Sequence, residues 1–264
     1  MDLKNINFKK SLGQNFLIDK NIVDKIINSA QIDRETLVIE IGPGSGALSK
    51  SIASLCGNLI CYEIDKSLKT ILDEELADFN NVLVKYEDFL NADVLKDIKD
   101  YSYKKLIVVA NLPYYVTTPI INKLIIDNIM PSLMVLMVQK EVADRFCAKK
   151  SSKNYNSLSV FLQYHYDINP LFIVSNNCFI PKPKVDSCVV RFKLKDEKLP
   201  VNDINKFYKL IRDSFRFKRK NLKNNLSSYD LDKVNLILSK YGFDLTARAE
   251  ELDLNIFVDI ANNI

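Results

Sequence analysis

The sequence lacks the segments and residue clusters that mark several classes of protein. Its 264 residues hold no uninterrupted apolar run near the length of about 18 residues that a membrane span needs, and residues 1–10 lack a signal-peptide core. The five cysteines form no Cys-x-x-Cys pair, and only one histidine is present. These absences argue against a membrane protein, a disulfide framework and a zinc site. We therefore expect a cytoplasmic protein that uses no metal and no membrane.

The single histidine also limits the chemistry. A hydrolase with an imidazole base would have to use His165, and its neighbours from Leu162 to Tyr166 contain no nucleophile motif. We therefore expect His165 to be structural. The net charge is only +4, so a surface for nucleic acid has to come from local clusters of lysine and arginine.

Apolar runs alternate with helix-length amphipathic stretches from residue 37 to residue 138. This alternation indicates βαβ units, and therefore a mostly parallel sheet with helices on both faces. A first helix is predicted after Asp19, a favourable N-cap, because apolar residues recur at helical spacing from Ile22 to Ile27. The predicted strands are 37–41, 59–62, 82–84, 106–110 and 133–138, with 185–193 closing the sheet in the antiparallel direction.

The pattern changes after Lys198-Leu199-Pro200. Strand-like runs end there, and helical patterns follow at 204–217, 231–241 and 254–260. We predict an α/β, Rossmann-like domain in residues 1–198 and a small all-helical C-terminal domain in residues 199–264.

A glycine-rich turn follows the first predicted strand, at Gly42-Pro43-Gly44-Ser45-Gly46. Glycine lets a backbone turn sharply at a strand end and approach a ligand closely, so we expect Gly42 and Gly44 to bind a cofactor. The turn does not identify that cofactor, because Gly42, Gly44 and Ala47 also satisfy the dinucleotide-binding pattern.

Acidic residues follow the next two strands. Glu63 lies about 20 residues after the glycine turn, where this fold binds ribose hydroxyls, whereas Asp65 fits a solvated acid at a strand end. Asp88 follows the third strand and is suited to accept a hydrogen bond from an adenine amino group. Because the carboxyl ends of parallel strands share one edge of a sheet, these residues predict a single ligand site.

The fourth strand leads into Asn111-Leu112-Pro113-Tyr114, which favours methyl transfer over hydride transfer. The lone pair of an adenine amine is delocalised into the ring. Two acceptors, the Asn111 side-chain oxygen and the Leu112 carbonyl, would hold the two amine protons so that positive charge can develop on the nitrogen. Pro113 fixes the direction of that carbonyl, and Tyr114 offers a face to a displaced base.

Five stretches carry a resemblance that runs from end to end: Leu12–Leu17, Glu40–Gly46, Asn111–Tyr114 with Thr118-Pro119, Gln139–Arg145 and Phe179–Ser187. The sequence resembles the KsgA-type small-subunit (16S) ribosomal RNA adenine dimethyltransferases, which are class I S-adenosylmethionine-dependent enzymes. One departure is Tyr115, where bacterial members more often have asparagine. It affects the fine positioning of the substrate rather than the reaction.

The resemblance implies that S-adenosyl-L-methionine is the methyl donor, with contacts at Asn15, Leu17, Gly42, Glu63, Asp88 and Asn111. It also implies that Phe179 packs on the target adenine opposite Tyr114. The implied substrate is a pair of adjacent adenosines in a hairpin loop near the 3′ end of 16S ribosomal RNA, each dimethylated on N6 within an immature small ribosomal subunit. We expect the enzyme to be a monomer.

Basic residues cluster between Arg212 and Lys223, where six of them stand against one acid, with two aromatic residues interleaved. Such a cluster suits RNA phosphates, although a solvated helix face has the same composition. Lys9 and Lys10 are candidates for the same surface. The residues that we predict to contact RNA are Arg216, Lys218, Arg219, Lys220 and Lys223.

Three other functions compete with this one. A resistance methylase for large-subunit ribosomal RNA would share the tetrapeptide, but the matches at 139–145 and 179–187 argue against it. A ribosome-assembly or transcription factor would keep the fold only to bind RNA, and the intact Glu63, Asp88 and Asn111 argue against lost catalysis. A dehydrogenase would share the glycine turn but has no use for the tetrapeptide.

Overall fold

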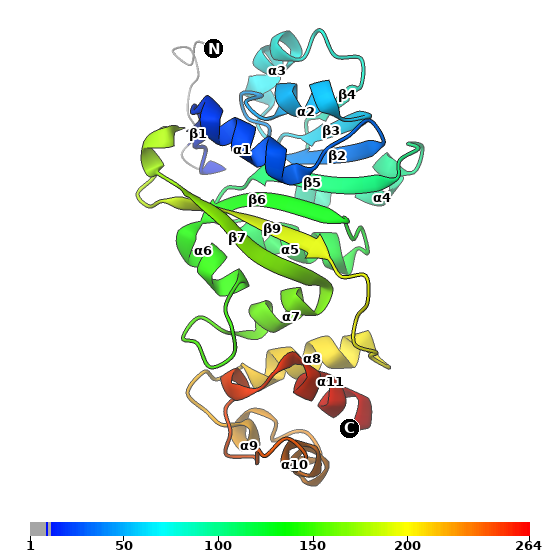
Figure 1. The fold of residues 1–264 in the computed structure, drawn as a ribbon, viewed down its shortest axis with the longest axis vertical. Coiled ribbons are helices and arrows are strands. Elements are labelled where there is room, and N and C mark those ends of the chain that lie inside the picture. Colours follow the sequence, from blue (N-terminus) through cyan, green and yellow to red (C-terminus); the bar gives the residue numbers. More distant parts are fainter. Residues whose placement is uncertain (1–8, 10–11) are drawn as a thin grey trace. The chain divides into compact units, whose positions relative to one another are not determined.

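A seven-stranded sheet forms the centre of the larger part of the chain (Figure 1). The structure is a computed structural model, which describes residue 9 and residues 12–264. Strands β2 to β6 are parallel to their neighbours, and β9 runs antiparallel to β6, which confirms the predicted mostly parallel sheet with an antiparallel closing strand. In spatial order the strands are β4 (Val82–Lys85), β3 (Asn58–Tyr62), β2 (Thr36–Ile41), β5 (Lys105–Asn111), β6 (Leu133–Gln139), β9 (Ser187–Leu194) and β7 (Tyr166–Val174).

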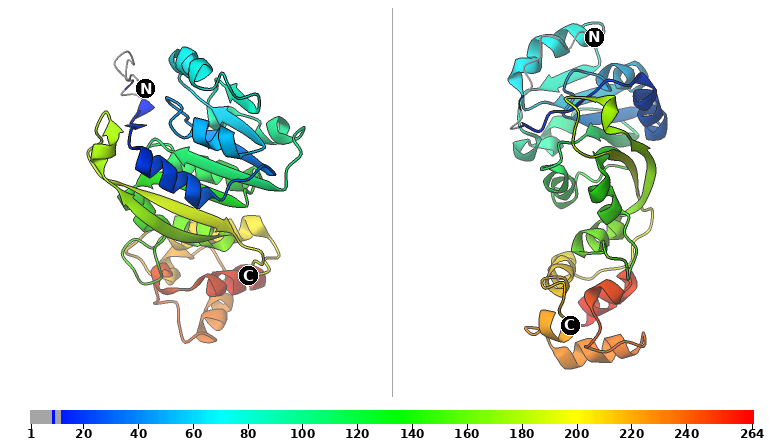
Figure 2. Two further views of the ribbon diagram at one scale, coloured as in Figure 1. Left: turned by 45° about the horizontal axis from the view of Figure 1, so that its top comes forward. Right: turned by 90° about the vertical axis from the view of Figure 1, so that its left-hand side faces the viewer.

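The central strands are mostly apolar because helices cover both faces of the sheet. All residues of β2 are buried, and Val38, Leu59 and Ile107 belong to one core with buried side chains of α1 and α2. Helices α1 and α5 lie on opposite faces of the sheet (Figures 1 and 2). The helices of this part are α1 (Lys20–Ala30), α2 (Ser49–Leu55), α3 (Lys69–Glu75), α4 (Val94–Ile98), α5 (Thr117–Ile126) and α6 (Lys140–Phe146), with short 3-10 turns η3 (Lys66–Leu68), η4 (Phe89–Asn91) and η5 (Asn176–Cys178).

The first helix begins where the sequence predicts. The Asp19 side chain accepts hydrogen bonds from the backbone N–H groups of Asn21 (2.9 Å) and Ile22 (3.4 Å), and thereby satisfies two donors that the first helical turn leaves open. None of the helices in the described part of the chain combines the length and the apolarity needed to cross a membrane.

A two-stranded sheet that the sequence did not predict joins two distant segments. Strand β1 (Phe16–Leu17) pairs antiparallel with β8 (Phe179–Ile180), so Leu17 lies opposite Phe179. This pairing fixes the segment that follows Leu12 beside the segment that follows η5.

The second compact part of the chain is helical. It contains α7 (Ser157–His165), α8 (Ile204–Ser214), α9 (Leu222–Asn225), α10 (Leu231–Ser239), η6 (Ala249–Glu251) and α11 (Leu254–Asn263). The three helices predicted after Lys198 are therefore confirmed.

Residues 144–168 pack with residues 195–264 into this helical part, whereas the sequence placed a boundary between residues 198 and 199. The difference has a physical cause, since Tyr155, Val160 and Tyr164 belong to the same core as Phe207 and Phe257. The division does not test the predicted functions of the two parts, which are methyl transfer and RNA binding.

His165 lies inside this helical part. It is 5% exposed, and its Nε2 lies 2.6 Å from the Tyr208 hydroxyl oxygen, so it joins α7 to α8. Burial lowers the pKa of His165 to about 4, and the charges of Lys198 and Lys195 act in the same direction. This position fits the structural role expected from the sequence.

Candidate active site

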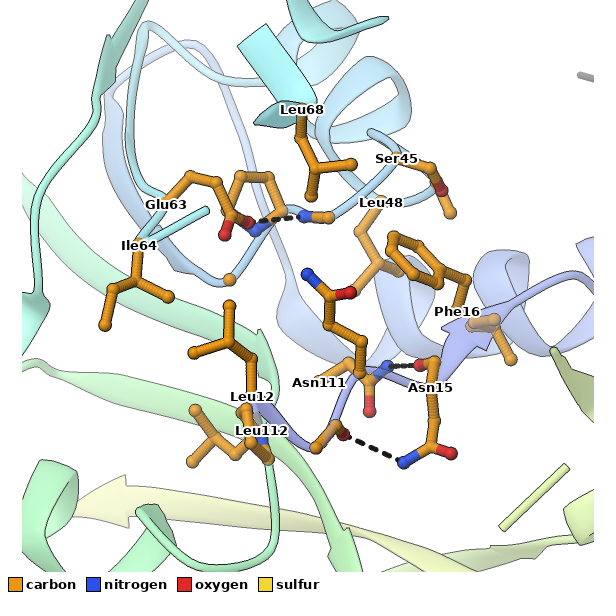
Figure 3. A pocket seen from close by; sticks show the side chains of 18 of the residues that line it. Leu12, Asn15, Phe16, Ser45, Leu48, Glu63, Ile64, Leu68, Asn111 and Leu112 are labelled. Carbon is orange, nitrogen blue, oxygen red and sulfur yellow. Dashed lines mark hydrogen bonds between the residues drawn. The ribbon is translucent and has the colours of Figure 1, made fainter. Parts of the chain in front are cut away.

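A pocket opens at the carboxyl ends of β2, β3 and β5 (Figure 3). It is the place where open α/β sheets bind their ligands. Four segments that lie far apart in the sequence meet there. The pocket is lined by residues 12–17, Glu40, Gly42, Pro43, Gly44, Ser45, Ala47, Leu48, Glu63, Ile64, Leu68 and residues 111–114.

The glycine turn holds Glu63 in place. Gly42 and Gly44 have φ values of +71° and +60°, in the left-handed region that favours glycine. The Gly44 N–H donates to Glu63 Oε2 (3.0 Å), and the Asp65 N–H donates to Glu63 Oε1 (2.8 Å). A Cβ on Gly44 would lie 3.0 Å from Cε1 of Phe16, so a larger residue would have to displace the Phe16 ring as well as adopt a strained positive φ.

Glu63 is suited to bind hydroxyl groups. Each oxygen of its carboxyl group accepts one hydrogen bond from a backbone amide. A carboxylate can accept about four hydrogen bonds, so positions remain for the hydroxyl groups of a ribose. Burial raises the pKa of Glu63, while the amides of Asp65 and Gly44 oppose this rise. The predicted ribose ligand therefore lies in the pocket with its orientation fixed by backbone donors.

The side-chain amide of Asn111 is oriented by the N-terminal segment. Its Nδ2 donates to the Asn15 backbone carbonyl (3.0 Å), and Asn15 Nδ2 in turn donates to the Gly13 carbonyl (3.0 Å; Figure 3). With Nδ2 engaged in this way, Oδ1 of Asn111 is the atom left to accept a hydrogen bond from a substrate amine. Asn15 thus contributes to the site through its carbonyl as well as by lining the pocket.

The rest of the tetrapeptide is fixed by hydrogen bonds to β6, α5 and β9. The Leu112 N–H donates to the Met137 carbonyl (3.1 Å), and the Thr117 hydroxyl donates to the Pro113 carbonyl (3.2 Å). The Tyr114 hydroxyl lies 3.2 Å from Oγ of Ser187, the first residue of β9. Ser187 could not be predicted as a partner of Tyr114, because the two residues are 73 positions apart.

Tyr115, the departure from the family pattern, lies at the rim of the site. Its side chain is 58% exposed, and its Cε1 would lie 3.4 Å from a Cβ built on Gly13. The ring therefore covers the backbone of the segment that lines the pocket.

Two predicted site residues are not among those that line the pocket. Asp88 caps η4, where its Oδ1 accepts from the Leu90 N–H (2.9 Å). Phe179 is 3% exposed and belongs to the core cluster that contains Leu17 and Val174. Its predicted stacking on adenine would require the ring to become uncovered, so the roles of Asp88 and Phe179 stay predictions.

Glu40 also lines the pocket, although the sequence pattern predicted no role for it. It is 1% exposed at the end of β2, and Cys61 Sγ donates to its Oε2 (3.6 Å). Burial raises the pKa of Glu40 to about 7, so its charge changes near neutral pH. The signal was present in the sequence, since an acid interrupts the apolar run before Gly42.

Asp65 corrects one prediction directly. It is 2% exposed, and its carboxylate accepts hydrogen bonds from Lys9 Nζ (2.5 Å), Gln14 Nε2 (2.7 Å) and the Ser67 N–H (3.0 Å). Burial opposes ionisation, but these donors outweigh it and lower the pKa of Asp65 to about 2. The predicted solvated acid is instead a buried anchor for the N-terminal segment. Lys10 lies outside the described residues.

Asp65→Asn should weaken S-adenosylmethionine binding several-fold, although Asp65 itself does not line the pocket. The variant loses the charged acceptor for Lys9 and Gln14, and the segment 12–17, which does line the pocket, loses one of its attachments. Calorimetric titration measures the affinity. Asp33→Asn is a matched control, because Asp33 pairs with Lys105 (2.6 Å) away from the pocket-lining residues. Equal affinities in the two variants would contradict the anchoring role.

Fold and site together define a class I S-adenosylmethionine-dependent methyltransferase. The parallel sheet, the glycine turn, an acid at the end of β3 and the tetrapeptide after β5 meet in one pocket, and a dehydrogenase has no use for the last of these. The sequence model of the ribosomal RNA adenine dimethylases matches residues 5–264, and the chain belongs to this family.

Individual relatives agree with this assignment. A protein of Listeria innocua named ribosomal RNA small subunit methyltransferase A is 46% identical over 265 residues, which cover 97% of this chain and 90% of the relative. The crystal structure of a dimethyladenosine transferase from Plasmodium falciparum has a TM-score of 0.79 and 26% identity. The match covers 93% of this chain and 95% of the Plasmodium chain. The structure of the 23S rRNA methyltransferase ErmE has a TM-score of 0.74 and 23% identity. The match covers 94% of this chain and 98% of ErmE, and at this identity it shows a similar fold only.

Proposed function

We propose that this ribosomal RNA adenine dimethyltransferase acts on two adjacent adenosines in a hairpin loop near the 3′ end of 16S ribosomal RNA. The substrate is an immature small subunit, and the enzyme acts on it as a monomer. The observation that carries the proposal is the hydrogen bond from Asn111 to Asn15, because it leaves an amide oxygen free to accept at the carboxyl end of β5. The choice of the small subunit is supported by the 46% identical relative, whose name specifies that subunit.

The residues of the tetrapeptide prepare the amine for attack. Asn111 Oδ1 and the Leu112 carbonyl accept hydrogen bonds from the two N–H groups of the N6 amine, which turns the nitrogen lone pair out of conjugation with the ring. Tyr114 presents its face to the displaced base, and Ser187 holds the phenol. S-adenosylmethionine supplies the methyl group, and Glu63 offers the acceptor that its ribose hydroxyls require. The described residues contain no group of three or more His, Cys, Asp or Glu side chains placed to hold a metal ion.

Methylation of small subunits that lack the modification, followed by mapping of the methylated bases, tests the proposal. We expect two neighbouring adenosines in 16S ribosomal RNA to carry two methyl groups each. Methylation confined to 23S ribosomal RNA would instead favour a resistance methylase, the enzyme class that shares the tetrapeptide. RNA binding without methyl transfer would favour an assembly factor.

The predicted RNA-contacting residues lie mostly in a loop rather than on a helix face. Residues 215–221 connect α8 to α9, and Lys223 follows in the first turn of α9. Asn225 holds this loop: its Oδ1 accepts from the Phe217 N–H (3.1 Å), and its Nδ2 donates to the carbonyls of Ser214 (2.7 Å), Phe217 (3.3 Å) and Lys220 (3.3 Å). The five exposed cations are Arg216, Lys218, Arg219, Lys220 and Lys223.

Replacing Arg219, Lys220 and Lys223 together by alanine should weaken binding to the immature subunit. Each lost phosphate contact should flatten the plot of log affinity against log salt by about 0.7 to 0.9. Cofactor affinity should not change, because none of the three residues lines the pocket. Subunit binding at several salt concentrations measures both quantities. If wild type and variant give superimposed salt plots, these cations contact no phosphate.

A further inference from the structure

A second cluster of lysines lies in the helical part of the chain, in the lysine loop, defined as residues 147–156 between α6 and α7. It contains Lys149, Lys150 and Lys153, all exposed. The proposed function does not use this loop. Three lysines in five positions, 149–153, repel one another, and a bound polyanion would relieve that repulsion.

The lysine loop is fixed to the helices that follow it in the sequence. The Ser151 N–H donates to the Glu250 carbonyl (2.7 Å), and the Tyr155 hydroxyl donates to the Leu252 carbonyl (3.3 Å). The buried ring of Tyr155 also meets Phe215 edge to face, with 5.9 Å between the ring centroids. These contacts fix the backbone of the lysine loop relative to the segment that begins at Phe215.

That segment is the basic loop 215–221. Lys218 Nζ donates to the Lys153 backbone carbonyl (2.9 Å), so the two basic loops touch directly. Next to this contact, Phe217 is 53% exposed, and the Arg216 guanidinium lies 5.3 Å from its ring centroid. Exposed aromatic rings beside cations suit unpaired RNA bases and their phosphates better than they suit an acidic protein surface.

The three lysines of the loop differ in their ion pairs. Lys150 lies 2.5 Å from the Asp253 carboxylate, which compensates its charge. Within the described part of the chain, neither Lys149 nor Lys153 forms an ion pair. Two of the three charges are therefore uncompensated.

We propose that the lysine loop and the loop 215–221 form one surface that binds ribosomal RNA phosphates, with Lys149 and Lys153 as contacts and Lys150 as a structural residue. The inference rests on the proposed function for the identity of the RNA. It adds a second loop, far away in the sequence, to the RNA-binding surface.

The test compares Lys149→Gln/Lys153→Gln with Lys150→Gln, which removes a lysine from the same loop. Glutamine keeps a polar side chain at these exposed positions, and thermal unfolding compared with the wild type verifies that each variant is folded. Binding to small subunits lacking the modification is measured over a range of salt concentrations. The double variant should bind several-fold more weakly, with a salt slope lower by about 0.7 to 0.9 for each of its two lost contacts. Lys150→Gln should keep the wild-type slope.

Two outcomes overturn the inference. Either the double variant gives a salt plot parallel to that of the wild type at equal affinity, or Lys150→Gln lowers the slope as much per lysine as the double variant does. Both leave the proposed function intact if the wild-type enzyme still methylates the small subunit. Failure of the proposed function has a different signature, because the wild-type enzyme then transfers no methyl group to 16S ribosomal RNA.

Discussion

Replacing Asn111 by alanine should reduce methyl transfer to ribosomal RNA by about 100-fold or more, the scale seen when one preorganised hydrogen-bonding group is removed from an active site. The variant loses Oδ1, the acceptor that holds one proton of the amine. RNA binding should remain substantial, because the predicted phosphate contacts lie in other residues. Single-turnover transfer from labelled S-adenosylmethionine to unmodified small subunits measures the chemical step separately from substrate binding.

The structure supplies a control for this experiment. Asn111→Asp keeps an acceptor oxygen but loses the Nδ2 donor to the Asn15 carbonyl. It should retain more methyl transfer than Asn111→Ala, while the loss of the contact to the N-terminal segment weakens cofactor binding. Wild-type transfer rates in Asn111→Ala would disprove the activation of the amine by this side chain.

Glu63→Ala should lower the affinity for S-adenosylmethionine by about ten-fold to 150-fold, which corresponds to about 1.5 to 3 kcal/mol for a hydrogen bond to a charged group. The loss has two sources. The variant removes an acceptor for the ribose, and it leaves the N–H groups of Gly44 and Asp65 without the oxygens that they bond at 3.0 and 2.8 Å. Calorimetry measures the affinity, and thermal unfolding shows whether the turn itself is destabilised.

Glu63→Gln removes only part of these interactions. Its amide oxygen still accepts from one of the two N–H groups, but its nitrogen cannot accept from the other. Its affinity should therefore lie between those of the wild type and Glu63→Ala. Unchanged affinity in a folded Glu63→Ala variant would remove Glu63 from the cofactor site.

Much of the sheet and part of the site followed from the sequence because both depend on local patterns. Buried parallel strands appear as apolar runs, and the residue after each run lies at the carboxyl edge of the sheet. Glu63 and Asn111 were found in this way, and both line the pocket. The residues 12–17 came only from the resemblance to a family, since no local pattern marks them as a cofactor segment.

What the sequence did not predict depends on contacts between distant residues. Asp65 resembles any acid at a strand end, and its partner Lys9 lies 56 positions earlier in the sequence. The pairing of Leu17 with Phe179 is equally invisible, because two-residue strands have no periodicity. Helix α7 was not assigned to the helical part, because its apolar residues are compatible with either core. Only its contacts with distant residues decide between the two.

The contacts of Asn225 have a consequence for the thermodynamics of RNA binding. Its single uncharged side chain bonds four backbone groups of Ser214, Phe217 and Lys220, so the loop that carries the cations is ordered before RNA arrives. The loop loses its conformational entropy when the protein folds, so binding to RNA does not carry that entropic cost. The strength of this surface is therefore a matter of preorganisation as well as of charge, and a count of lysines and arginines alone misjudges it.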